Sequence, residues 1–223
     1  MNLPQTPPHP IWDLPTRLFH WLLVAAFATA WLSAELGYME VHRWNGYTIL
    51  TLLGFRLLWG LFGSRHARFR DFLFPPATVL RYLRGAPVDY AGHNPAGGWS
   101  VLAMLLLLTI QGVTGLFATD EVLFEGPYYP AVSEATAAWL TTWHKFNFNL
   151  ILALVALHLA AIAYHRWIKG DNLVIAMLTG RHPARAGREP PVPLWRALVA
   201  LGLSGGLVAG VLALAPPPAS GWF

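Results

Sequence analysis

The sequence predicts an all-α membrane protein, in which a bundle of four transmembrane helices is followed by a fifth, C-terminal transmembrane helix. The first observation is composition: 55% of the 223 residues are hydrophobic and only 12% are charged. With a mean hydropathy of +0.44, the chain is too apolar for a soluble domain. The second is five apolar stretches, each close to the roughly 20 residues that a helix needs to cross the hydrocarbon core. The third is that basic residues gather in alternate connections.

The first 15 residues contain several prolines and lack the basic start and small-residue cleavage site of a signal peptide, so we expect a retained, extended tail. No internal repeat is evident. We divide the chain into a four-helix domain, 1–190, and an additional helix with its tail, 191–223. The five expected spans are 18–36, 44–62, 99–118, 138–168 and 194–214.

The connections set the orientation. Those after the second and fourth spans carry nine lysines and arginines, whereas segments 35–40 and 119–137 carry none. The positive-inside rule places the basic loops and the N-terminus in the cytoplasm and the C-terminus in the periplasm of a bacterial inner membrane. We also expect a short interfacial helix within 63–98. The basic residues are Arg65, Arg68, Arg70, Arg81, Arg84, Lys169, Arg181, Arg185 and Arg188.

Composition also excludes several classes of function. The net charge of +4 is explained by these loops, so no nucleic-acid partner is expected. The chain has no cysteine, which excludes disulfides, iron–sulfur clusters and covalent haem attachment. Eleven tryptophans and seven tyrosines suit the aromatic belts at the membrane interfaces.

Two histidines of the fourth span, His144 and His158, lie fourteen residues apart. On a helix they are about 21 Å apart along the axis and within roughly 40° of one face. An ionisable residue inside a span is costly and marks a functional site, and neutral imidazole is a common axial ligand of haem iron. The alternative is that both histidines only hydrogen-bond to neighbouring helices. Two on one face favour one metal ligand near each side of the membrane.

Two further histidines supply partners at matching depths. His20 stands near the inner start of the first span and His42 at the outer start of the second. With alternating topology, His42 shares the outer level with His144, and His20 shares the inner half with His158. We therefore predict four metal ligands that hold two non-covalent, bis-histidine b haems within the four-helix bundle.

His165 is the rival for the inner position, but it would stretch the ligand separation to about 31 Å, the whole hydrocarbon thickness. We therefore assign it to a haem propionate, a quinone headgroup or a cationic cap of the helix end. Arg56 lies fourteen residues after His42 on the same face and is expected to bind an inner-haem propionate; the alternative is an arginine that snorkels to the interface. Gly46 and Gly112 are expected to make room for a flat macrocycle, although small residues also serve helix packing.

The remaining histidines have no expected partner at membrane depth and are predicted to be solvated surface residues. They are His9, His66, His93 and His182.

With these residues in place, the sequence resembles the bacterial cytochrome b561 family, which includes the cytochrome b subunits of nickel-iron hydrogenases and the superoxide oxidase. The matching stretches are WDLPTRLFHW, VHRWNGY, GHNPAGGW and the segment from SEATAAWL to AMLTG, within residues 11–180. The resemblance implies a di-haem membrane cytochrome whose ligand pattern falls on the same four histidines. The fifth span is not part of the family's four-helix core, and we expect such an addition to dock a partner or another copy.

Bis-histidine haems have all six iron positions filled and suit one-electron transfer. The leading hypothesis is a cytochrome that carries electrons between the quinone pool and a periplasmic c-type cytochrome or dehydrogenase subunit. The alternative is a superoxide:quinone oxidoreductase, in which Arg43 and Lys145, each next to an outer ligand, attract the anion. A third hypothesis is a haem-free transporter whose histidines relay protons. A homo-oligomer is also open.

Overall fold

A computed structural model describes residues 9–120 and 124–217. The tails 1–8 and 218–223, and residues 121–123 of the outer connection, lie outside these ranges. The described residues confirm the all-α class, with five long helices, three short ones and two 3-10 turns. The long helices are α1 (Leu14–Glu35), α2 (Met39–Phe62), α5 (Pro95–Gly115), α6 (Glu134–Trp167) and α8 (Leu194–Ala213). The short helices are α3 (Phe69–Phe72), α4 (Pro76–Leu83) and α7 (Leu173–Thr179), and the turns are Arg65–Ala67 and Tyr129–Ala131.

Four of the long helices, α1, α5, α6 and α8, are long and apolar enough to cross a membrane. Helix α2 has the length, 24 residues, but contains charged and polar side chains such as Arg56 and Asn45. It packs against α1, α5 and α8, so much of its surface faces protein and not lipid. A helix with protein on three sides needs less apolar surface than one that faces lipid.

Three helices begin about four residues before the predicted spans because polar caps start them outside the apolar run. Asp13 caps α1 by accepting from the Thr16 backbone N–H at 2.9 Å. Asn94 caps α5 in the same way, and Ser133 caps α6. Side-chain oxygens at these positions satisfy the free N–H groups of the first turn. The apolar pattern therefore predicts the apolar part of each of these helices but not its first turn.

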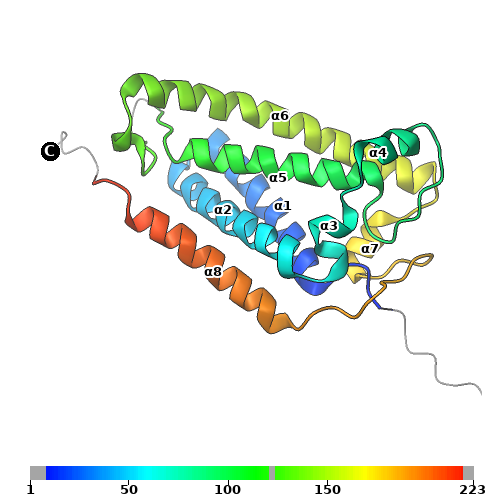
Figure 1. Cartoon of the computed structure of the whole chain (residues 1–223). Coiled ribbons are helices and arrows are strands. Elements are labelled where there is room, and N and C mark those ends of the chain that lie inside the picture. The colour runs from blue at the N-terminus through cyan, green and yellow to red at the C-terminus, as the bar shows by residue number, and fades with distance from the viewer. Residues whose placement is uncertain (1–8, 121–123, 218–223) are drawn as a thin grey trace, which may run out of the picture.

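The chain runs back and forth, so that successive long helices are antiparallel (Figure 1). Helices α3, α4 and α7 gather at one end of the bundle, with the start of α1 and of α8. That end holds the connections that carry the arginines. A short helix is present within 63–98 as α4, and its place at the membrane interface stays a prediction. The shared end agrees with the alternating topology, whereas the orientation in the membrane stays a prediction.

Helix α8 lies against the outer side of α2 (Figure 1). The hydroxyl of Ser204 donates to the Thr51 carbonyl at 2.7 Å, and a Cβ on Gly54 would come within 2.2 Å of the Ser204 Oγ. At its far end, the Tyr128 hydroxyl donates to the Val211 carbonyl at 2.6 Å. Close approach through small residues and hydroxyls is the usual way in which helices pack in membranes. The division at residue 190 stays a prediction.

Candidate functional site

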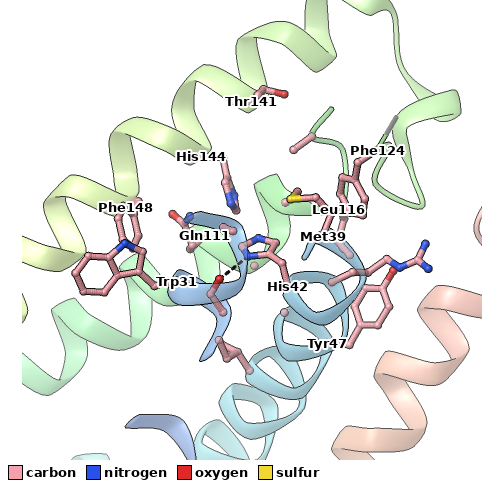
Figure 2. Close-up of a pocket in the computed structure, with 18 of the residues that line it drawn as sticks. Trp31, Met39, His42, Tyr47, Gln111, Leu116, Phe124, Thr141, His144 and Phe148 are labelled. Atoms are coloured by element: carbon pink, nitrogen blue, oxygen red, sulfur yellow. Dashed lines mark hydrogen bonds between the residues drawn. The ribbon is translucent and has the colours of Figure 1, made fainter. Parts of the chain in front are cut away.

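His42 and His144 face each other across the end of the bundle opposite α3 and α7. His42 comes from the first turn of α2 and His144 from the third turn of α6. Their ring centres are 6.2 Å apart and the ring planes are 79° apart. Figure 2 shows the two imidazoles pointing toward one another from their helices. The structure thus brings together the two histidines that the sequence paired at the outer level.

Hydrogen bonds fix the tautomer of both rings. The Nδ1 of His42 lies 2.8 Å from the Ala30 carbonyl oxygen, which can only accept, so this nitrogen carries the proton. The Nδ1 of His144 lies 3.1 Å from the Thr114 Oγ1. That hydroxyl donates its own hydrogen to the Ile110 carbonyl at 2.7 Å, so it accepts from His144. Each ring therefore keeps an Nε2 lone pair free, which is how histidine ligands are oriented in metal sites.

The two rings line a cavity of about 520 Å³. One wall is aromatic and is formed by α1 and α6. The Phe148 ring of α6 lies 6.0 Å from the Phe27 ring and 5.8 Å from the Trp31 ring, both of α1, between ring centres. Gly46 also lines the cavity, and a Cβ there would meet nothing within 4 Å. This space is large, mostly apolar and bounded by two imidazole side chains.

The other glycines at this level let helices and rings approach. A Cβ on Gly115 would lie 3.0 Å from the His144 ring, and one on Gly112 would lie 2.5 Å from Leu50. Gly112 lines the cavity, but it also serves the packing of α5 on α2. The packing use is therefore present at Gly112, and its role beside a macrocycle stays a prediction.

These residues fit a haem and do not fit a bare metal ion. Within the described part of the chain, no group of three or more His, Asp or Glu residues could hold an ion. A pair of imidazoles suits a metal whose other four ligands come from a macrocycle. Two metal–nitrogen bonds of about 2 Å, on opposite sides of one iron, would hold the ring centres roughly 6 Å apart. The observed separation of His42 and His144 matches that requirement.

The second pair lies in the other half of the bundle. His20 of α1 and His158 of α6 are close enough to interact electrostatically. The His20 ring stands edge-on to Trp21, with ring centres 4.9 Å apart, and its Nδ1 is buried with no partner among the described residues. The ligand role of all four histidines stays a prediction.

Arg56 is buried within the bundle. Arg56 is only 2% exposed. Its side chain therefore does not reach solvent, which contradicts the snorkelling alternative. Its guanidinium lies over the rings of Phe69 and Phe72, with centroid distances of 4.9 and 5.7 Å, and Nη1 has no partner in the described residues. An arginine that is buried with a free donor needs an acceptor.

The structure contradicts the prediction of solvated surface residues for His93 and His182. The ring of His93 lies against Trp12 and Phe72, with ring centres 4.6 Å apart in each case, and its Nδ1 is buried. The side chain of His182 is 7% exposed and bonds to Asp171. Loop position in the sequence gave no signal that the connections fold back over the helix ends.

His165 is buried at the same end and linked to two other segments. Its Nε2 accepts from the Asn94 side-chain amide at 3.3 Å, and its Nδ1 lies 3.4 Å from Asp171 Oδ2. Asp171 also accepts from His182 and from Arg185. Burial alone would raise the pKa of Asp171, but the His182 hydrogen bond and the charge of Arg185 hold this pKa below its usual value. His165 is therefore part of a network, and its place at a cofactor stays a prediction.

Residues 11–180 match the family model for prokaryotic cytochrome b561, a range that contains all four paired histidines and Arg56. The chain belongs to the prokaryotic cytochrome b561 family. As a member of this family, it is a membrane-bound b-type cytochrome that transfers electrons through haem b. The haem-free hypothesis is therefore wrong. Helix α8 lies outside the matched range.

Two curated relatives support the assignment to the cytochrome b561 family. The chain is 22% identical to a probable Ni/Fe-hydrogenase B-type cytochrome subunit of Azotobacter chroococcum, over 76% of this chain and 86% of the relative. It is 19% identical to the probable Ni/Fe-hydrogenase 1 B-type cytochrome subunit of Escherichia coli K12, over 81% of this chain and 93% of the relative. No solved structure gives a significant match.

Proposed function

We propose that this cytochrome holds two b haems, one between His42 and His144 and one between His20 and His158, and that it conducts electrons across the bacterial inner membrane. The observation that carries the proposal is the outer pair. Its rings are at the distance that one iron requires, and both Nε2 atoms are free because both Nδ1 atoms are bonded.

Two such sites on one helix form a path for electrons. His144 and His158 are separated by about 21 Å along α6, so a macrocycle at each leaves a much shorter gap between ring edges. Iron with two histidines and a macrocycle has no open position for a substrate. The protein then holds and insulates the two redox centres, and the aromatic wall around the outer cavity keeps water away from one of them.

The partners follow from the two ends of this path. Because the relatives are named as cytochrome subunits of Ni/Fe hydrogenase, we propose a redox enzyme subunit or a c-type cytochrome at the outer, periplasmic end. We propose the quinone pool as the partner at the inner end, where Asn94 and His165 offer polar groups next to the bundle. A homo-oligomer, with α8 as an available surface, remains a prediction.

The test is an optical spectrum of the purified protein with a haem-to-protein ratio. We expect two b haems per chain, with His144→Ala losing the outer haem and His158→Ala the inner one. His9→Ala is the matched control, because His9 is exposed and lies before the first helix of the bundle. Unchanged haem content in either ligand variant contradicts the assignment. Electron flow is then followed by adding quinol and measuring the reduction of an external c-type cytochrome.

A second function is favoured by one observation: Arg43 and Lys145 both line the outer cavity. Two cations beside an outer haem would attract superoxide, whose oxidation would pass one electron to the haem and then to quinone. Glu35 and Asp120 line the same cavity, however, and Arg43 is paired with Glu40, so the mouth is not uniformly positive. Rapid haem reduction by superoxide, lost in Lys145→Gln, would support this function over the first.

A further inference from the structure

Buried polar atoms without partners gather at the end of the bundle that carries α3 and α7. Among the described residues, five buried side-chain nitrogen or oxygen atoms have no hydrogen-bond partner. Four of them belong to the start of α1, the last turns of α2 and the connection before α5, which meet at this end (Figure 1). They are Thr16 Oγ1, His20 Nδ1, Arg56 Nη1 and His93 Nδ1. Such atoms are rare and costly in native proteins, so their gathering indicates a missing acceptor.

Arg56 and His93 share one aromatic neighbour. The Cζ of Arg56 lies 5.7 Å from the centre of the Phe72 ring, and the ring centre of His93 lies 4.6 Å from it. Trp12 is the other ring contact of His93, with ring centres also 4.6 Å apart. The guanidinium and the imidazole therefore meet around one ring, each with a buried nitrogen that has nothing to donate to.

The nearest carboxylate of the chain does not fill this role. Asp13 lies within electrostatic range of Arg56, but its two oxygens accept from the Thr16 backbone N–H at 2.9 Å and from the Trp59 indole N–H at 3.0 Å. No hydrogen bond joins Asp13 to Arg56 among the described residues. The free donor of Arg56 thus remains available for a second anion.

The groups around His93 also favour an anion. Burial is the main cause that lowers the pKa of His93 to about 3, and the neighbouring Arg56, His158 and His66 lower it further. The ring is therefore neutral near pH 7 and offers a single N–H. The titratable groups that act on His93 are all basic, and both oxygens of the nearest carboxylate, Asp13, already accept hydrogen bonds.

We propose that Arg56 and His93 form a carboxylate-binding site, and that its ligand is a propionate of the inner haem. This inference rests on the proposed function, because it requires a haem between His20 and His158. It adds His93 to the residues that position that haem. The sequence alone gave no reason to include His93, because it lies in a loop with no expected partner at membrane depth. His93 acts here as a positioning residue and donates to the carboxylate without touching the iron.

The test uses the full-length protein with its haems. Cells are fed a haem precursor whose isotope label enters the propionate carboxyl carbons, and redox-difference infrared spectra separate propionate bands, which shift with the label, from protein carboxyl bands. We expect Arg56→Gln and His93→Phe each to move a label-sensitive band of the inner haem. Phenylalanine keeps the ring packing on Trp12 and Phe72 and removes the N–H, so this variant stays informative if Arg56→Gln fails to fold.

The redox potential gives a second readout. Removing the positive charge of Arg56 disfavours electron uptake, so Arg56→Gln should weaken the inner haem's reduction about tenfold, equivalent to about 59 mV for a one-electron couple. The outer haem should be unchanged. Arg70→Gln is the control, because it removes the same charge from a side chain on α3 that is 76% exposed; it should move neither the bands nor the potential.

The outcomes separate the two levels of the proposal. If wild-type protein holds two haems and neither variant moves a label-sensitive band, the carboxylate site is refuted while the di-haem assignment stands. The carboxylate site is likewise refuted if the inner potential follows the choice of halide in the buffer, which would indicate a free anion. If His93→Phe abolishes the inner haem's low-spin spectrum, His93 is a ligand, and both the carboxylate site and the assignment of the inner haem to His20 and His158 are refuted. Wild-type protein with no haem at His20 and His158 refutes the proposed function itself.

Discussion

Replacing Thr114 by valine tests whether the outer ligand pair is oriented as the hydrogen bonds indicate. The change keeps the volume of the side chain and removes the oxygen that accepts from His144 Nδ1 at 3.1 Å. Loss of such an outer-shell partner typically costs 10- to 100-fold in metal affinity, which is about 1.4–2.8 kcal/mol. Because the imidazole also becomes a weaker electron donor, we expect the potential of the outer haem to rise.

The control lies on the same helix. Thr109 donates to the Leu105 carbonyl at 2.7 Å, just as Thr114 donates to Ile110, but it has no histidine partner in the described structure. Thr109→Val therefore reports the cost of losing the hydroxyl bond to the helix backbone alone. Haem retention on dilution and a potentiometric titration measure the difference between the two variants. Equal retention and equal outer-haem potentials would refute the orienting role of Thr114.

Three further predictions follow from packing and charge. Gly46→Leu should fill part of the outer cavity and reduce occupancy of the outer haem, measured by the haem-to-protein ratio, whereas Gly206→Leu, where a Cβ also meets nothing within 4 Å, should not. Gly54→Leu should push Ser204 aside and loosen α8, seen as faster proteolysis or hydrogen exchange of α8 with normal haem content; unchanged protection of α8 would count against the docking. Asp171 has a folded-state pKa below its unfolded value of about 3.9, so its stabilisation is full above that pH and is lost as the pH falls through the folded-state pKa. Asp171→Asn should therefore expose segment 168–190 to protease already at pH 7, because the lost hydrogen bonds lower the stability of the segment by about 1–3 kcal/mol. A segment that stays protected in that variant would contradict the role of the network.

The fold could be predicted from the sequence to a large extent because lipid imposes a simple rule. Apolar stretches of the right length must be helices, and four of the five expected spans meet the criteria of length and apolarity in the structure. Helix ends were less predictable, since Asp13, Asn94 and Ser133 extend helices beyond the apolar run through hydrogen bonds. The packing of α8 on α2 depends on Ser204 and Gly54, two small residues among many.

The site was predictable only in its outline. Spacing of fourteen residues placed His144 and His158 on one face, and alternating topology paired His42 with His144, which the structure brings together. The atoms that orient the two imidazoles are a carbonyl of α1, at Ala30, and a hydroxyl of α5, at Thr114. Neither is distinguishable from other alanines or threonines before the helices are packed.

Connections were the weakest part of the sequence argument because composition does not tell a solvated loop from one that closes a bundle. The segment GHNP looks polar, yet it places His93 between two aromatic rings and Asn94 on His165. Its glycine and proline are typical of a turn at the surface. Its fold is set by tertiary contacts with Trp12, α3 and α6, which no local pattern records.

Helix α2 shows how burial reverses the usual argument from hydropathy. It is the one long helix that falls short of the apolarity of a membrane span, and it carries both His42 and the buried Arg56. Polar groups such as these are tolerable within a bundle only where neighbouring helices or a cofactor cover them. The contacts of α2 with α1, α5 and α8 supply that cover. A chain lacking α8 should therefore lose stability first at α2, and His42 and Arg56 would be the residues that report it.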